Sequence, residues 1–231
     1  NFTIDGGSTL NLSASNTSTS NVTSGSAIEP DNVTLEFTHK DLQASNIYGD
    51  SRLPSVGDAK IVVVPVIVPT VTGFSHTNSE LVSIRNDIEK CFFGEESDTA
   101  WHSLKSYYYE SSFGKLNISG TVLPWYDATS SYSKLTSISD NDIQVIIAAA
   151  LKKNDIKTED YDGDNDGIID GVWVVYSAPD YYTYYQRYGK DMCSNADTYW
   201  AFTYWASNDY SSTNYNFNVF AWASYDFMYA G

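Results

Sequence analysis

An aspartate-rich stretch carries the strongest chemical signal in this 231-residue chain. Residues 159–170 have the sequence EDYDGDNDGIID, in which acidic side chains alternate with glycine and asparagine. Hard cations such as Ca²⁺ take several oxygen ligands from one short, sharply turned loop. The candidate ligands are the side chains of Asp160, Asp162, Asp164, Asp166 and Asp170 and the carbonyl of Ile168. We therefore predict a structural calcium site between the helix that precedes this loop and the strand that follows it.

This loop matches only part of an EF-hand calcium loop. With Asp162 at position one, Gly167 falls at the turn, but position twelve is Trp173 instead of the bidentate Glu. A plain acidic turn is the alternative interpretation. We favour calcium, because five carboxylates within eleven residues would repel one another at neutral pH without a cation.

Histidine is the residue on which a catalytic zinc site would depend. Such a site needs about three protein ligands in tetrahedral geometry. The chain has three histidines, His39, His76 and His102, and none lies one helical turn from another. No G-x-S-x-G, P-loop or G-x-G-x-x-G pattern occurs either. We therefore assign no catalytic residue to this chain.

Composition excludes some classes of partner. The 13 basic and 29 acidic residues give a formal net charge of −16, which repels nucleic acid and anionic membranes. No apolar run is long enough to cross a bilayer, so we expect no membrane insertion. Cys91 and Cys193 could form one disulfide or remain two buried thiols, and the sequence leaves both possibilities open.

The elements that would position the loop alternate between strands and helices. Apolar runs predict strands at residues 59–69, 115–126, 171–178, 199–205 and 219–227. Helical periodicity predicts helices at residues 79–92, 98–110 and 140–153. This order indicates an α/β domain over residues 53–231. Residues 1–52 are expected to be a polar leader, a linker or the remnant of a preceding β module.

Several local signals sharpen these element assignments. Thr77 and Glu80 have the spacing of a capping box, and Ser139 suits the N-cap of the third helix. Pro65 lacks a ladder donor, so the first strand should have a bulge or a free edge there. The second helix should place Trp101, Leu104 and Tyr108 on one side.

Aromatic residues crowd the tract 181–229. Exposed rows of Tyr and Trp could stack on sugars or line a peptide cleft. Packing in a core and between loops is the alternative, and we prefer it for Trp200, Trp205 and Trp222.

Four segments in order resemble one protein family. They are GDAKIVVVPV at 57–66, YYYESSFGKLNISGTVLPWY at 107–126, the Asp-rich loop with DGVWVVY at 170–176, and the Trp-containing strand at 199–205. Together they are similar to the catalytic domain of the immune inhibitor A family of secreted bacterial zinc metallopeptidases. The resemblance covers roughly residues 53–227.

The resemblance implies a fold and an activity. The expected fold is α/β (α+β) and zincin-like, a mixed, mainly parallel twisted sheet of about five strands with three helices. A protein or peptide substrate would lie along an edge strand at 199–205, with Trp200, Phe202 and Tyr204 as candidate contacts.

The zinc of the family would lie outside this chain. In the family, the helix with the His-Glu-x-x-His motif follows the final strand of the catalytic domain. No such motif occurs in this sequence. The chain is expected to be the inactive N-terminal part of a secreted endopeptidase, with an apolar sheet face left for the C-terminal remainder of the polypeptide.

Two other functions fit the residues. A non-enzymatic calcium-dependent module could bind carbohydrate or protein through the Tyr/Trp tract, and a degenerate peptidase homologue could serve as an adhesin or scaffold. The order of the four segments favours the peptidase, because a binding module has no reason to reproduce it.

Overall fold

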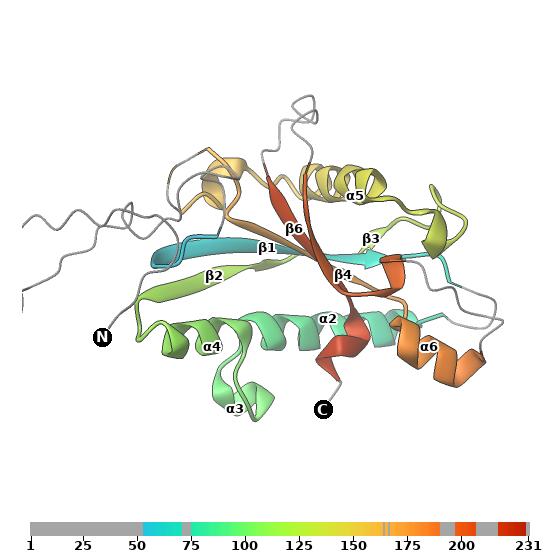
Figure 1. Cartoon of the computed structure of the whole chain (residues 1–231), viewed down its shortest axis with the longest axis horizontal. Helices are drawn as coiled ribbons and strands as arrows, with labels where there is room; N and C mark the ends of the chain where they lie inside the picture. The colour runs from blue at the N-terminus through green and yellow to red at the C-terminus, as the bar shows by residue number, and fades with distance from the viewer. Residues whose placement is uncertain are drawn as a thin grey trace, which may run out of the picture. The chain divides into compact units, whose positions relative to one another are not determined.

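The computed structural model describes residues 53–70, 75–163, 165, 167–189, 197–206 and 217–229. The predicted polar leader, residues 1–52, lies outside the described residues. In the described part, a sheet is covered by helices on both faces (Figure 1).

The sheet is mixed and mainly parallel, as predicted. Its six strands are β1 (Gly57–Ile67), β2 (Leu116–Val122), β3 (Tyr126–Asp127), β4 (Gly171–Tyr176), β5 (Phe202–Trp205) and β6 (Val219–Ser224). The order is β2-β1-β4-β6-β5, and the short β3 also pairs with β1. All pairs are parallel except β5 with β6. One antiparallel strand therefore closes one edge of the sheet.

Helices lie on both faces of the sheet. The described residues form five α-helices, α2 (Asn78–Phe93), α3 (Glu96–Thr99), α4 (Leu104–Ser111), α5 (Asp140–Lys153) and α6 (Tyr181–Tyr188), where the sequence predicted three. Figure 1 shows α5 on one face and α2 with α4 on the other. The crossover from β1 to β2 runs through α2, and the crossover from β2 to β4 runs through α5.

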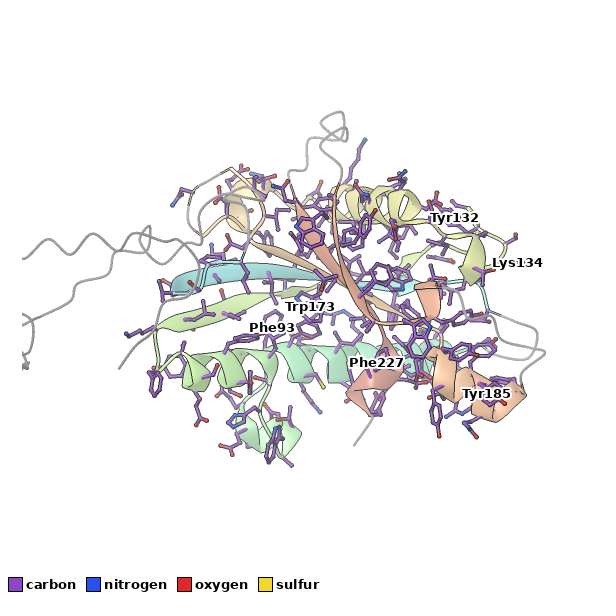
Figure 2. All side chains as sticks on the ribbon, viewed as in Figure 1. Phe93, Tyr132, Lys134, Trp173, Tyr185 and Phe227 are labelled. Atoms are coloured by element: carbon purple, nitrogen blue, oxygen red, sulfur yellow. The ribbon has the colours of Figure 1, made fainter. Side chains whose placement is uncertain are left out.

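Strand β1 is buried on both faces, as its β-branched run predicts. Val62, Val64 and Val66 pack in the hydrophobic cluster on the α5 side. Ile61 and Val63 pack in the cluster on the α2 side, where Figure 2 shows Phe93 and Trp173 between the sheet and the helices. Each fully buried aliphatic side chain contributes about 1.5–3 kcal/mol, so this central strand holds the two layers together.

Helix α5 begins and ends as the sequence predicts. Ser139 and Asp142 form a capping box, and the predicted apolar stripe of Ile143, Ile146, Ile147, Ala150 and Leu151 is buried. The pKa of Asp142 is lowered: burial alone would raise it, but hydrogen bonds from Ser139 and Tyr132 outweigh burial. The predicted capping box of Thr77 and Glu80 also begins α2.

Pro65 occupies a gap in the ladder, as predicted. The β1–β2 pairing ends at Val63, and the β1–β3 pairing begins at Val66. The carbonyls of Val63 and Ile67 accept bonds from the β2–β3 side, so the nitrogen of Pro65 faces that same side. The missing N–H therefore costs no strand hydrogen bond.

The predicted single helix over residues 98–110 is wrong. Ala100 adopts a left-handed conformation, with φ of 56°, and ends α3. Ser103 then begins α4 with a capping box of its own. Trp101 falls in the break and is 75% exposed, and Tyr108 is also exposed, whereas Leu104 packs against the core, so these three residues do not form the single helical side that was predicted.

Helix α6 was not predicted. Asp180 caps it by accepting bonds from the backbone N–H groups of Tyr182 and Thr183. Only Tyr184 in this helix is buried, so no apolar stripe signals the helix in the sequence. None of the helices in the described ranges is long and apolar enough to span a membrane.

Candidate functional site

Strand β5 is the best candidate for a peptide-binding edge. Within the described residues its one strand partner is β6, and the predicted strand at 199–205 is shortened because Asp197–Tyr199 form a 3₁₀ turn. The Ala206 N–H donates to the Asn218 carbonyl at 2.7 Å, in register with the rest of the pair. Since backbone groups alternate in direction along a strand, the N–H and C=O of Thr203 point away from β6.

The three predicted contact residues do not share one environment. Phe202 and Tyr204 lie over β6, where the Phe202 ring is 6.4 Å from that of Trp222 and the Tyr204 ring is 6.1 Å from that of Phe220. Trp200 precedes the strand, and its ring lies 5.1 Å from that of Tyr181 on α6. The candidate contacts therefore divide between one face of β5 and α6.

Core packing explains only part of the aromatic tract. Trp222 is fully buried and stacks on Tyr176 with 4.8 Å between ring centroids, as the packing interpretation predicts. Trp200 and Trp205 are 43% and 52% exposed and lie outside the core, but the Trp200 ring packs against that of Tyr181, as packing between loops predicts. Trp205 is the last residue of β5, and Trp200 lies two residues before the strand begins.

The two faces of β6 are covered unequally. Phe220, Trp222 and Ser224 are buried, and the first two belong to the cluster on the α5 side. The alternate residues Val219, Ala221 and Ala223 face the other side and stay partly exposed. Small side chains on this face would allow another element to approach the sheet closely, and the uncovered apolar face expected from the sequence stays a prediction.

The described part of the calcium loop is sharply folded. The Gly167 N–H donates to Asp162 Oδ2 at 2.8 Å, and Gly167 has a φ of 86° that favours glycine. Asn165 is also left-handed, with φ of 60°. The turn expected at the sixth position is therefore present.

Asp170 fastens this loop to the sheet. Its Oδ2 accepts bonds from the Lys60 N–H on β1 at 2.7 Å and from the Gly163 N–H at 3.0 Å. The side chain is 7% exposed, so both bonds are sheltered from water. This oxygen has a structural task that the sequence did not reveal, because Lys60 lies 110 residues away.

Calcium binding by this loop stays a prediction. Asp160 lies in an exposed 3₁₀ turn, Ile168 is partly exposed, and Asp164 and Asp166 lie outside the described residues. Among the residues that are described, no group of three or more His, Cys, Asp or Glu side chains converges on one point.

The described histidines have structural partners. His76 Nε2 lies 2.8 Å from the Ser177 carbonyl, and the ring packs edge-on against Tyr225 at 4.9 Å. His102 Nε2 lies 3.4 Å from Glu110 Oε2. These two histidines have different partners, and His39 lies outside the described residues. The described histidines, His76 and His102, do not fit a catalytic zinc site.

Cys91 lies on α2, where burial raises the pKa of its thiol. Cys193, with which it could form a disulfide, lies outside the described residues. The choice between one disulfide and two separate thiols therefore stays open.

A polar cluster at the carboxyl ends of β1, β4 and β6 was missed by the sequence analysis. In the strand order β2-β1-β4-β6, the chain passes from β1 to β2 on one side and from β4 toward β6 on the other, so the carboxyl ends of β1 and β4 form a switch point of the kind where open α/β sheets commonly bind ligands. Ser177 Oγ accepts from the Val68 N–H at 3.2 Å there. Asp226 follows β6, and its Oδ2 is buried with no hydrogen-bond partner among the described residues.

Asp226 should make stability depend on pH. Burial raises its pKa above the ordinary 3.8 and Asp180 raises it further, while the Tyr225 hydrogen bond, Arg187 and His76 act in the opposite direction. The folded state therefore retains the proton longer than the unfolded state, and stability falls as pH rises from the ordinary pKa through the raised one.

Replacing Asp226 with Asn should remove this loss. We expect Asp226→Asn to gain about 1 kcal/mol at pH 7, a modest figure because the residue is partly exposed, and nothing at pH 3. Thermal melts at both pH values measure the difference. A variant that is less stable than wild type at pH 7 would mean that the carboxylate has a favourable ionic partner.

Comparison of the chain with known protein families and with curated protein sequences found no match. The assignment of function therefore depends on the residues and geometry described above.

Proposed function

We propose that this chain forms the substrate-binding part of the catalytic domain of a secreted bacterial zinc endopeptidase resembling immune inhibitor A. The catalytic zinc would be held by residues outside these 231, since the histidines described here do not fit it. Within this proposal the sheet is zincin-like, and the chain alone binds peptides without cleaving them.

The antiparallel edge strand is the observation that carries the proposal. An otherwise parallel sheet ends in β5, the strand that the resemblance independently selects for substrate. An extended peptide could add to this edge through the N–H and C=O of Thr203, as in other cases of strand addition. The half-exposed rings of Trp200 and Tyr204 would then lie beside its side chains.

The uneven cover of β6 supports the same proposal. A helix packed against Val219, Ala221 and Ala223 would bury the partly exposed face. The expected helix with the His-Glu-x-x-His motif would follow β6 in the polypeptide and suit this surface. The proposal predicts that a natural polypeptide extending beyond Gly231 carries that motif and hydrolyses casein in a chelator-sensitive way. A longer natural polypeptide without paired His and Glu at helical spacing would exclude the peptidase proposal.

Calcium is the second part of the proposal. The folded turn at Gly167 and the link from Asp170 to β1 support an ordered loop at the entry to β4. Calcium would balance the carboxylates of Asp162, Asp164 and Asp166 and hold that loop in place. Its role would be structural, because the loop precedes β4 and no described residue of β5 contributes to it.

A proline substitution tests the edge strand directly. Thr203→Pro removes an N–H that faces away from β6, so the fold should keep its melting temperature within about 3 °C. Binding of fluorescein-labelled casein to the 231-residue chain should weaken about tenfold, because the added strand loses a backbone bond and meets the proline ring.

Two variants make this result interpretable. Thr203→Val keeps the N–H and should bind casein as wild type does. Tyr204→Pro removes an N–H on the side of β6 and should destabilise the fold by about 3 kcal/mol. Unchanged casein binding by a folded Thr203→Pro protein would exclude β5 as the substrate strand.

A further inference from the structure

An exposed aromatic cluster lies at the junction of α3 and α4, outside both hydrophobic clusters of the core. It consists of Trp101, His102, Tyr107 and Tyr108, and we call it the Trp101 cluster. Trp101, Tyr107 and Tyr108 are 75%, 54% and 42% exposed. Neighbouring rings contact one another, with centroid separations of 5.8, 6.4 and 5.4 Å along the cluster. Contiguous exposed aromatic surface of this kind marks interaction sites.

The cluster is held rigidly. The left-handed Ala100 donates its N–H to the Glu96 carbonyl, and the Thr99 hydroxyl donates to the carbonyl of Trp101. On the other side, the Ser103 capping box fixes the start of α4. His102, between the two large rings, lies 3.3 Å from Ser106 Oγ. A partner would therefore meet preorganised rings and lose little affinity to ordering them.

The two helices that carry these rings also carry exposed carboxylates. Glu96, Asp98 and Glu110 are exposed on α3 and α4, and the side chain of Glu110 is 72% exposed although it contacts His102. Lys105, the one basic residue of these two helices, lies 3.1 Å from Glu95, which offsets its charge. The surface therefore combines negative charge with the electron-rich faces of Trp and Tyr.

The ring angles distinguish between classes of ligand. The interplanar angles are 72°, 64° and 84°, so adjacent rings stand edge to face. Such rings form no flat platform of the kind on which successive sugar rings stack. They present faces in different directions, which suits a cation that approaches an aromatic face while a carboxylate lies beside it.

We propose that the Trp101 cluster binds a basic segment of a protein partner through cation–π contacts of its Arg or Lys side chains with Trp101 and Tyr107. Glu96 and Glu110 would supply the complementary charge. The surface lies on α3 and α4, whereas the proposed substrate strand is β5, so this inference does not depend on peptidase activity.

Fluorescence anisotropy with the 231-residue chain tests this proposal. The probe is a labelled peptide of alternating Gly and Arg, and the matched control peptide carries neutral citrulline in place of each Arg. We expect saturable binding of the Arg peptide that weakens with salt and little binding of the citrulline peptide. Trp101→Ala should weaken binding of the Arg peptide about fivefold.

Matched variants separate the cluster from general charge. Tyr182→Ala removes a ring that is 66% exposed on α6 and should leave binding unchanged. Glu110→Gln should weaken binding of the Arg peptide without lowering the melting temperature. This variant tests the proposal even if Trp101→Ala unfolds the segment between α3 and α4. Equal binding of the citrulline peptide, or equal losses in Tyr182→Ala and Trp101→Ala, would overturn the proposal.

Discussion

Replacing Gly163 with Ala is expected to detach the aspartate-rich loop from the sheet. A Cβ at this position would lie 2.3 Å from the Asp58 carbonyl oxygen on β1 and 2.8 Å from Asp170 Oδ2. Neither atom can yield easily, because one is backbone and the other accepts two partly buried hydrogen bonds from backbone N–H groups. We expect a loss of about 3 kcal/mol in the free energy of unfolding, measured by urea denaturation.

Gly167→Ala is the matched control for this substitution. No atom lies within 4 Å of the added Cβ, although the φ of 86° makes any side chain unfavourable. The expected loss is about 1 kcal/mol, from backbone strain alone. Equal losses in the two variants would mean that Gly163 does not clamp the loop to β1.

Calcium titration of the same proteins reports on the proposed cation. If calcium binds the folded loop, a concentration of about 100 Kd stabilises wild type by about 2.7 kcal/mol, seen as a higher melting temperature. Asp164→Ala with Asp166→Ala should abolish this gain, and Gly163→Ala should reduce it. Glu96→Ala, an exposed acid outside the loop, should retain it. A wild type that gains nothing would identify the stretch as a plain turn.

Replacing Trp222 with Ala is expected to loosen the edge of the sheet that carries β5. The indole is fully buried, lies 6.4 Å from the Phe202 ring and donates its Nε1–H to the Thr198 carbonyl at 2.9 Å. It therefore links β6 to the segment that leads into β5. We expect a loss of about 4 kcal/mol in the free energy of unfolding, from cavity formation and the unpaired carbonyl.

Two substitutions define this effect. Trp222→Phe retains much of the packing but not the hydrogen bond, so it should cost roughly half as much. Trp205→Ala removes an indole that is 52% exposed and should cost less than about 1 kcal/mol. If Trp205→Ala and Trp222→Ala were equally destabilising, the assignment of Trp222 to the core would be wrong.

Local signals in the sequence determined the elements that have strong periodicity and caps. Helix α5 combines a serine N-cap, an acidic first turn and an apolar stripe, and its bounds, Asp140–Lys153, are the predicted ones. Strand β1 is apolar without interruption from Ile61 to Ile67, where both of its faces are buried. In these elements each residue's own preference agrees with its tertiary surroundings.

Elements with weaker patterns depended on the tertiary structure. The break between α3 and α4 arises because Ala100 takes a left-handed conformation, which its side chain gives no reason to expect. Helix α6 buries only Tyr184, so its aromatic-rich sequence has no apolar periodicity that would predict a helix, although Asp180 caps it. The aspartate spacing indicated a sharp turn, and Gly167 supplies it.

The sequence alone determined the composition of the candidate site but not its arrangement. It named the aspartate loop and the segment that contains β5, because both are continuous in the chain. Only the fold brought Asp170 to the Lys60 N–H and left Asp226 Oδ2 buried beyond the end of β6. These contacts join residues far apart in the sequence, and they depend on the order of the strands and on the direction in which each side chain points. Local propensity predicts neither the strand order nor the side-chain direction.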